Sequence, residues 1–378
     1  MFTNLIDGRQ RRPSSRSANR RRGISTTAMI IKFGHNIIGD NQPVYVIAEA
    51  GVNHNGDIKL AKQLVDVAKQ AGADCVKFQT FTADEFISDK KSTYTYTSQG
   101  KEVTESQYEM FKRLEFSEKD WQEIINYCKE KGVVFATTAQ SPSDLDFILK
   151  LTSLPFIKVG SDDLTSLDLI SYYAKKGIPM VISAGMSDEA EISDAIETIQ
   201  QAGNKQIVIL HCVSSYPAKA QEVNLKKIPA IKNKFNVIVG FSDHTQGSAA
   251  ATGAVYFGSK VIEKHFTLSH DLPGPDHWFS ADPKELKKYI IDIRLAEQMI
   301  GSGEIVPTAN EEEIKKIARR SIVAKTTITA GEKFTNDNLE FKRPGTGISP
   351  RFKRQLLGRA ASQAYQLGDQ IKENFKIN

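Results

Sequence analysis

Apolar residues recur in a regular rhythm through most of the chain. A short β-branched run is followed by polar or glycine residues and then by an amphipathic helical pattern, and the unit repeats eight times. The expected strands cover residues 44–49, 75–80, 133–138, 156–160, 180–183, 207–212, 237–241 and 261–265. The expected helices cover residues 58–71, 118–131, 142–151, 167–176, 189–202, 225–234, 248–257 and 283–300. This count of units predicts an α/β fold, the (β/α)8 TIM barrel.

The rest of the pattern sets the domain boundaries. An open doubly wound sheet is the alternative to the barrel, but no glycine-rich fingerprint follows the first strand. A short hairpin is expected over residues 30–40, and residues 82–117 are interpreted as a long loop. After Gly301 the rhythm stops and short β-leaning pieces follow. We therefore expect a basic leader (1–29), a barrel domain (30–302), a linker (303–320) and a small, mostly β domain (321–378).

The charge of the chain is concentrated at its start. The net charge is +5, but residues 1–28 alone carry seven arginines and one acid, so the remainder is near −1. A nucleic-acid-binding body is therefore not expected, and no apolar run is long enough for a membrane span. The leader has the composition of a transit peptide, a basic arm or an extension upstream of a start at Met29. Three scattered cysteines fit a reducing compartment, and we expect the cytoplasm.

Imidazole and ammonium groups stand where the apolar runs end. The C-terminal ends of barrel strands meet at one rim, which is where active sites lie. His244 and His265 follow two successive runs, and two imidazoles with acidic groups nearby fit a divalent transition metal. Lys77 and Lys158 lie within apolar runs, where lysine is seldom buried without an anionic partner. Lysines and hydroxyls at this rim indicate a site for a phosphate and a carboxylate, beside a metal that polarises a carbonyl oxygen.

Six motifs, in order, resemble the sialic acid synthase family, which comprises N-acetylneuraminate synthase and related nonulosonate synthases. They are IAEAGVNHNG (47–56), VKFQT (76–80), KVGS (158–161), GFSDHT (240–245), KHFT (264–267) and PGPD (273–276). The resemblance implies a TIM barrel with a C-terminal SAF (antifreeze-like) domain. It also implies a reaction in which phosphoenolpyruvate condenses with an N-acylated mannosamine-like sugar, giving a nine-carbon 2-keto acid and phosphate.

The resemblance assigns roles to residues of this chain. His244 and His265 would bind the divalent metal, Mn²⁺ or Mg²⁺, and Glu49, Lys77 and Lys158 would be catalytic. Substrate-binding residues would be Gln79, Thr138, Ser161, Asp163, Ser183, Ser214, Tyr216, Ser242, Asp276 and Arg343. Arg343 would come from the SAF domain of the partner subunit, which implies a homodimer with exchanged SAF domains.

Some positions depart from the family pattern and leave alternatives open. Residues 160–163 are Gly-Ser-Asp-Asp where these synthases often have Gly-Ser-Gly-Glu, and Ser214 replaces a common asparagine. The sugar therefore stays open between N-acetylmannosamine and the diacetamido-trideoxyhexoses used by legionaminic and pseudaminic acid synthases. Two other kinds of function also stay open, a metal-dependent barrel hydrolase and a non-enzymatic binding protein. Such a hydrolase usually has a His-x-His pair on its first strand. This chain lacks that pair.

Overall fold

The computed structural model describes residues 29–374, and the chain divides into two compact units between Ile300 and Gly301. The expected basic leader falls almost wholly on residues 1–28, which lie outside the described range. The first unit opens with an antiparallel hairpin of β1 (Ile30–Phe33) and β2 (Asn36–Gly39), as the alternating pattern predicts.

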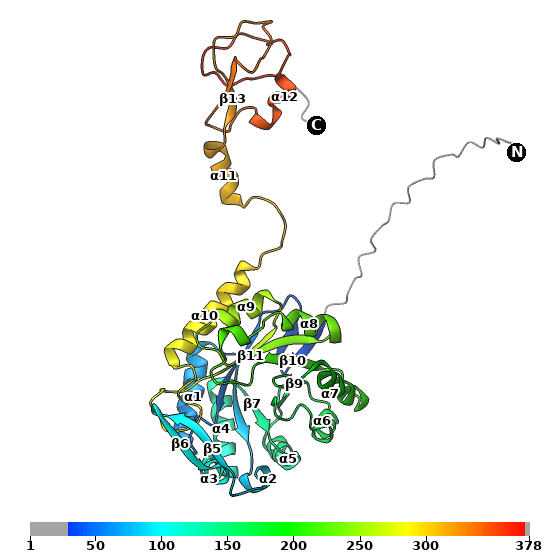
Figure 1. The fold of residues 1–378 in the computed structure, drawn as a ribbon, viewed down its shortest axis with the longest axis vertical. Helices are drawn as coiled ribbons and strands as arrows, with labels where there is room; N and C mark the ends of the chain where they lie inside the picture. The colour runs from blue at the N-terminus through cyan, green and yellow to red at the C-terminus, as the bar shows by residue number, and fades with distance from the viewer. Residues whose placement is uncertain (1–28, 375–378) are drawn as a thin grey trace, which may run out of the picture. The chain divides into compact units, whose positions relative to one another are not determined.

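Eight parallel strands close into a barrel in the first unit, which confirms the TIM-barrel prediction (Figure 1). They are β3 (Tyr45–Gly51), β4 (Cys75–Thr80), β7 (Val134–Ala139), β8 (Ile157–Val159), β9 (Met180–Ser183), β10 (Ile207–Cys212), β11 (Ile238–Asp243) and β12 (Val261–His265). The last strand pairs with the first, with His265 opposite Glu49. Ile31, Phe33 and Ile38 of the β1–β2 hairpin pack with inward apolar residues from the starts of the strands. Apolar residues thus fill the end of the barrel where the strands start, and the polar side chains lie at the C-terminal ends of the strands.

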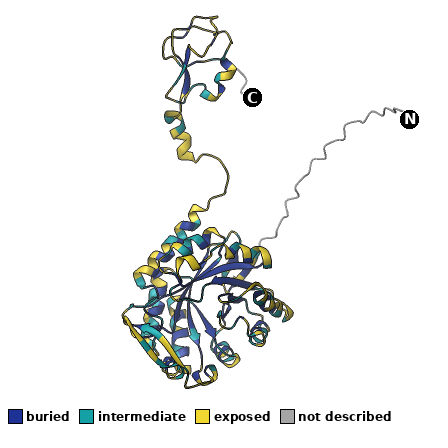
Figure 2. Cartoon of the chain, in the orientation of Figure 1, coloured by how far each residue is buried: buried dark blue, intermediate teal, exposed yellow. Residues whose placement is uncertain are grey.

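Helices cover the outside of the barrel, with their buried faces toward the strands (Figure 2). They are α1 (Ile58–Ala71), α4 (Glu118–Lys131), α5 (Pro142–Leu151), α6 (Leu167–Ala174), α7 (Glu189–Gln201), α8 (Lys227–Phe235), α9 (Ala249–Tyr256) and α10 (Pro283–Met299), with a 3-10 turn, η1 (Ala220–Glu222). In α1, Asp57 accepts a hydrogen bond from the amide of Lys59 and Gly72 ends the helix at φ 89°. Local capping and an apolar stripe thus explain why this segment is helical.

The segment from 82 to 117 is ordered, although the sequence was interpreted as a long loop. It contains α2 (Ala83–Phe86), β5 (Thr93–Ser98), β6 (Lys101–Ser106) and α3 (Gln107–Leu114). β5 and β6 form an antiparallel hairpin turned by Gln99 and Gly100, whose φ angles are 51° and 72°. Positive φ at both turn positions matches the right-handed twist of a two-residue hairpin. Alternating threonine and tyrosine before a glycine turn was the missed signal.

The second unit is small and has a core of its own. Its elements are α11 (Ala309–Ala318), β13 (Ser321–Ala324), β14 (Leu339–Lys342), η2 (Pro350–Phe352) and α12 (Lys353–Leu356). β13 and β14 pair antiparallel. The core gathers Ile322, Ala324, Ile328, Phe334, Leu339, Leu356, Ala361, Tyr365 and Ile371. Across residues 29–374, no helix has both the length and the apolar character needed to cross a membrane.

Candidate active site

Strand alternation turns ionisable side chains toward the barrel axis at the C-terminal ends of the strands. On β12, Glu263 and His265 share one face while Lys264 takes the other, because successive strand residues point to opposite sides. Glu49 of β3 lies opposite Lys77 of β4 in the strand register. Each strand therefore delivers one or two polar groups to the same level of the barrel.

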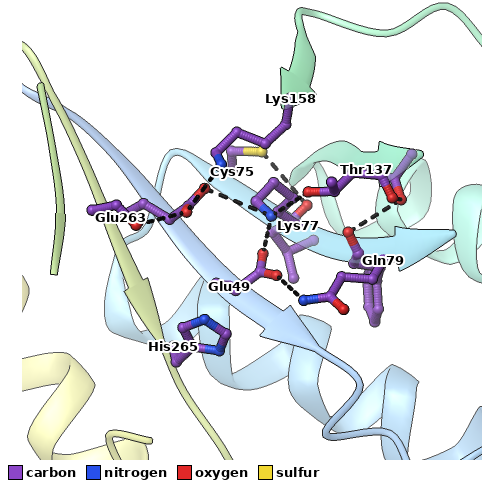
Figure 3. A network of polar contacts seen from close by, with 12 residues as sticks. Glu49, Cys75, Lys77, Gln79, Thr137, Lys158, Glu263 and His265 are labelled. Carbon is purple, nitrogen blue, oxygen red and sulfur yellow. Dashed lines mark hydrogen bonds and ion pairs between the residues drawn. The ribbon is translucent and has the colours of Figure 1, made fainter. Parts of the chain in front are cut away.

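Four of these side chains form a charged network, which we call the floor: Glu49, Lys77, Lys158 and Glu263 (Figure 3). The Lys77 Nζ lies 2.6 Å from Glu49 Oε2 and 3.6 Å from Glu263 Oε2. The Lys158 Nζ lies 3.6 Å from Glu263 Oε1. All four side chains are at most 5% exposed. Glu263 therefore joins both lysines, and the floor holds two cations and two carboxyl groups.

The pKa values of the two carboxyl groups of the floor are shifted in opposite directions. Burial raises the pKa of Glu49 to about 7, although Lys77 opposes the shift. Burial would also raise the pKa of Glu263, but Lys158, Lys77 and His265 lower it to about 2. Burial likewise would lower the pKa of Lys77, but Glu263 and Glu49 raise it. Glu263 is thus a permanent anion, whereas Glu49 is suited to exchange a proton near neutral pH.

Hydroxyl groups surround the two lysines. Lys77 donates to Thr138 Oγ1 at 2.8 Å, and Lys158 donates to Ser183 Oγ at 2.9 Å. Ser242 Oγ donates to Glu263 Oε1 at 3.0 Å. These hydroxyls and ammonium groups together present donors suited to the oxygens of a phosphate or carboxylate.

Three further sequence-predicted residues border the floor. Gln79 Nε2 donates to Glu49 Oε1 at 3.2 Å. Ser161 Oγ accepts the amide of Gly185 at 3.0 Å, and a Cβ at Gly185 would lie 2.7 Å from Ser161 Oγ and 2.3 Å from Ser214 Oγ. Glycine at 185 therefore lets the backbone approach both serines.

The two histidines lie side by side at the rim, with ring centroids 5.6 Å apart. His244 Nδ1 donates to the carbonyl of Val213 at 2.8 Å, which leaves its Nε2 as the free nitrogen. His265 Nδ1 is buried without a hydrogen-bond partner, 3.9 Å from Asp276 Oδ2. Tyr216 packs against His244 with a centroid separation of 4.0 Å. One fixed and one unpartnered imidazole form a donor pair that fits a divalent cation.

The pKa values of the two histidines affect how readily they bind a cation. Burial and His244 hold the pKa of His265 well below its ordinary value, so its ring is neutral at pH 7. Burial would lower the pKa of His244 as well, but its hydrogen bond with the adjacent Cys212 thiol raises the pKa above its ordinary value. Within residues 29–374, no group of three or more His, Cys, Asp or Glu could hold a metal ion. The protein donors to a cation would therefore be these two imidazoles, with other positions open to water or substrate.

A cavity of about 530 Å³ lies next to His265. Gln79, Tyr216, His265 and Asp276 line it, as do residues of the β5–β6 hairpin. Burial raises the pKa of Asp276 to about 6. Asp162 also lines the cavity, whereas Asp163, the residue chosen from the sequence, accepts a hydrogen bond from Ser166 Oγ at 3.4 Å. A one-residue difference in a turn decides which carboxylate faces the cavity.

One site residue, Glu263, was missed in the sequence, and one predicted residue, Arg343, lies in the second unit. Glu263 was not chosen, although it stands two residues before His265 and strand alternation places both on one face. Arg343 is exposed and follows β14 in the second unit, so it is described apart from the barrel.

Comparisons with known proteins show which family the chain belongs to. The NeuB family model matches residues 64–305 and the SAF domain model matches residues 319–374, which confirms the expected C-terminal domain. N,N'-diacetyllegionaminic acid synthase of Legionella pneumophila is 40% identical over 334 residues, 87% of this chain and 94% of that protein. Human N-acetylneuraminate-9-phosphate synthase is 33% identical over 346 residues, 90% of this chain and 95% of that protein.

A solved structure is similar as well. The sialic acid synthetase of Leptospira borgpetersenii, in complex with citrate, superposes with a TM-score of 0.68 and 31% identity, covering 76% of this chain and 95% of that one. The chain therefore belongs to the NeuB family and carries a C-terminal SAF domain.

Proposed function

We propose that the protein condenses phosphoenolpyruvate with an N-acylated amino sugar to give a nine-carbon 2-keto acid and phosphate. The single observation that supports this most is the pair of buried lysines, Lys77 and Lys158, each of which donates to a hydroxyl. Glu263 is ionised, and when Glu49 is protonated the floor carries a net positive charge, which suits the phosphate and carboxylate of phosphoenolpyruvate. Relatives named as synthases of legionaminic acid and N-acetylneuraminate 9-phosphate support the same product class.

The proposed chemistry balances without an oxidant or reductant. C3 of phosphoenolpyruvate forms a bond to the sugar's aldehyde carbon, water adds at C2, and the C2–O bond breaks to release phosphate and a ketone. The lysines, with Thr138, Ser161, Ser183 and Ser242, would hold the phosphate and carboxylate.

Glu49 would receive and return the protons of the attacking water. Its pKa near 7 suits a group that must change protonation during turnover. Glu263 would stay ionised and hold both lysines in place. Because these carboxyl groups differ in pKa, only one of them is suited to proton transfer.

The sugar would bind between the histidines and the cavity wall. Gln79, Ser214, Tyr216 and Asp276 offer hydrogen-bonding groups to its hydroxyl and acylamino substituents. His244 and His265 would hold Mn²⁺ or Mg²⁺, which supplies a Lewis acid that polarises the aldehyde oxygen. We also propose that Arg343 of a second copy completes the site, in a homodimer with exchanged SAF domains.

A legionaminic-type product is the second candidate. The legionaminic acid synthase of Legionella is 40% identical to this chain, and the human N-acetylneuraminate-9-phosphate synthase 33%. Three of the departures from the family pattern, at Asp162, Asp163 and Ser214, lie at or next to positions assigned to the substrate.

The test measures phosphate release from phosphoenolpyruvate with Mn²⁺ and one sugar at a time. The sugars are N-acetylmannosamine, its 6-phosphate, and a 2,4-diacetamido-2,4,6-trideoxyhexose. We expect release that depends on both substrates, with a nine-carbon product by mass spectrometry. Release without sugar would indicate a phosphatase or other hydrolase, and no release with any sugar would favour a binding protein.

A further inference from the structure

The β5–β6 hairpin forms one wall of the cavity next to the histidines. Tyr94, Thr95, Tyr96, Thr97 and Glu102 of this hairpin all line it. The hairpin is also tied to the loop after β12, which lies far away in sequence. Gln99 Nε2 donates to the carbonyl of Asp271 at 2.8 Å, and Ser98 Oγ accepts the amide of Gly274 at 3.1 Å. This loop carries Asp276, so the hairpin and Asp276 hold fixed positions relative to each other.

A chain of polar contacts fixes the tyrosines of the hairpin. The Tyr96 hydroxyl donates to Glu105 Oε1 at 2.6 Å. Arg113 donates two hydrogen bonds to the same carboxylate, of 2.8 and 2.9 Å. Tyr94 stacks on Tyr96 with a centroid separation of 5.8 Å and an interplanar angle of 24°. The Tyr94 ring therefore packs on a neighbour that is itself held in place, and both tyrosines line the cavity.

Tyr94 is an exposed residue (44%), and its hydroxyl has no hydrogen-bond partner among residues 29–374, so the hydroxyl is available to a ligand in the cavity. Tyr94 and Asp276 both line the cavity, and burial together with the Asp276 carboxylate raises the pKa of Tyr94. The Tyr94 hydroxyl as donor and the Asp276 carboxylate as acceptor can both hydrogen-bond to a sugar hydroxyl or acylamino group.

The rest of the cavity lining combines aromatic and other apolar side chains with carboxylates. Its large side chains are Phe86, Met110, Phe111, Trp278 and Phe279, and its carboxylates are Glu102, Asp162 and Asp276. Among the described residues that line the cavity, none is a lysine or an arginine. The aromatic side chains favour methyl groups, which lose water against them, and the three carboxylates disfavour a phosphate dianion at this part of the wall.

We infer that the β5–β6 hairpin determines sugar specificity, that Tyr94 contacts the sugar, and that this wall selects an uncharged hexose with apolar substituents over a 6-phosphorylated one. The inference rests on the proposed function and narrows its substrate class. A deoxy methyl group and a second acetamido group match the aromatic side chains, whereas a 6-phosphate would face carboxylates.

The first test compares kcat/KM for the three sugars named above at saturating phosphoenolpyruvate. We expect the diacetamido-trideoxyhexose to exceed N-acetylmannosamine by about tenfold or more, since each buried methyl group adds a few-fold. We expect the 6-phosphate to be the poorest substrate, by about 100-fold or more, from like-charge repulsion. A 6-phosphate turned over as well as the neutral sugars would overturn the inference.

A binding measurement separates this inference from the proposed function. If no sugar releases phosphate, the proposed function fails, and calorimetric titration with the same three sugars still tests the wall. Tighter binding of the diacetamido sugar than of the 6-phosphate would support the inference. The reverse order, or no discrimination, would contradict it.

Variants of the wall give the second test. Tyr94→Ala should raise the KM for the sugar about tenfold, and Tyr94→Phe should raise it about fivefold, the value of one lost hydrogen bond. The KM for phosphoenolpyruvate and the melting temperature should stay unchanged in both. Glu102→Lys should improve kcat/KM for the 6-phosphate by about fivefold or more, by replacing repulsion with attraction.

The matched control is Tyr256→Ala, an exposed tyrosine on α9 that does not line the cavity. It should leave both KM values unchanged. Equal effects of Tyr94→Ala on sugar and phosphoenolpyruvate, or none on the sugar, would contradict a contact between Tyr94 and the sugar.

Discussion

The charged floor of the barrel and the aromatic wall beside it are built by different parts of the fold. The floor comes from strands β3, β4, β8 and β12, and its four charged groups are paired with one another. The wall comes largely from the β5–β6 hairpin and the loop after β12, and Tyr94 there has no hydrogen-bond partner among the described residues. Strands hold groups more precisely than loops, whereas loops vary more easily. The floor is thus suited to the reaction and the wall to the choice of substrate.

The largest expected effect comes from removing one positive charge from the floor, which tests whether the floor carries out the reaction. We expect Lys77→Met to lower kcat/KM for phosphoenolpyruvate by about 10³-fold, as for loss of a preorganised electrostatic contact. The variant should still fold, because Glu49 can take a proton in place of its lost partner. Near-normal turnover by steady-state kinetics would contradict the role of the floor.

Lys264→Met is the matched control for that variant. Lys264 is also a buried lysine, but it points away from the floor, donates to the carbonyl of Thr245 and lies 3.6 Å from Asp243 Oδ2. Its loss should lower the melting temperature, because a buried carboxylate loses its partner, with a smaller effect on kcat/KM. Equal kinetic losses in both variants would mean that burial of charge, and not position in the floor, matters.

A second prediction concerns the histidines between floor and wall. His265→Ala should abolish most turnover and weaken Mn²⁺ binding, by about 100-fold or more, since it removes one of two imidazole donors. Metal affinity is measured by calorimetry on the chelator-treated protein, with His270→Ala as the control. Retention of Mn²⁺ affinity in His265→Ala would refute the metal assignment.

The third prediction asks whether the wall is completed by another subunit. Arg343→Ala should lose about 100-fold in kcat/KM for the sugar, because a guanidinium makes fixed, planar hydrogen bonds. Mixing it with inactive His265→Ala should restore about a quarter of wild-type activity after subunit exchange, because half of the dimers then hold one intact site. Arg351→Ala serves as the control. No recovery after prolonged exchange would show that Arg343 does not act across subunits.

The smallest expected effect is a pH dependence that separates the two floor carboxylates. If Glu49 acts as a base, kcat/KM should rise about tenfold per pH unit below about 7 and then level off. Its pKa is raised in the folded protein, so its contribution to stability is present below pH 4.5 and is lost as pH rises through about 7. Glu49→Gln should flatten both profiles. A profile governed only by groups titrating near pH 2 would exclude Glu49.

Much of the barrel could be predicted because each strand and helix has a local periodic signal. Lys77, Lys158 and the histidines were found for the same reason, since each interrupts or ends an apolar run. The β5–β6 hairpin was missed because its first strand has alternating threonine and tyrosine in place of an apolar run, although this alternation and the turn at Gln99 and Gly100 are local signals. Asp162 could not be told from Asp163, because the direction of a side chain in a turn depends on dihedral angles set by tertiary contacts.

The pairing of β12 with β3 has a consequence for the order of assembly during synthesis. His265 lies opposite Glu49 in the register, although more than 200 residues separate them. A growing chain therefore exposes Glu49 and Lys77 on the ribosome long before Glu263 and His265 are translated. Long-range pairing of this kind forms late, after its loop-closure entropy has been overcome. The floor should therefore be one of the last parts of the barrel to form, and a prematurely ended chain would display its carboxylate and lysine without their partners.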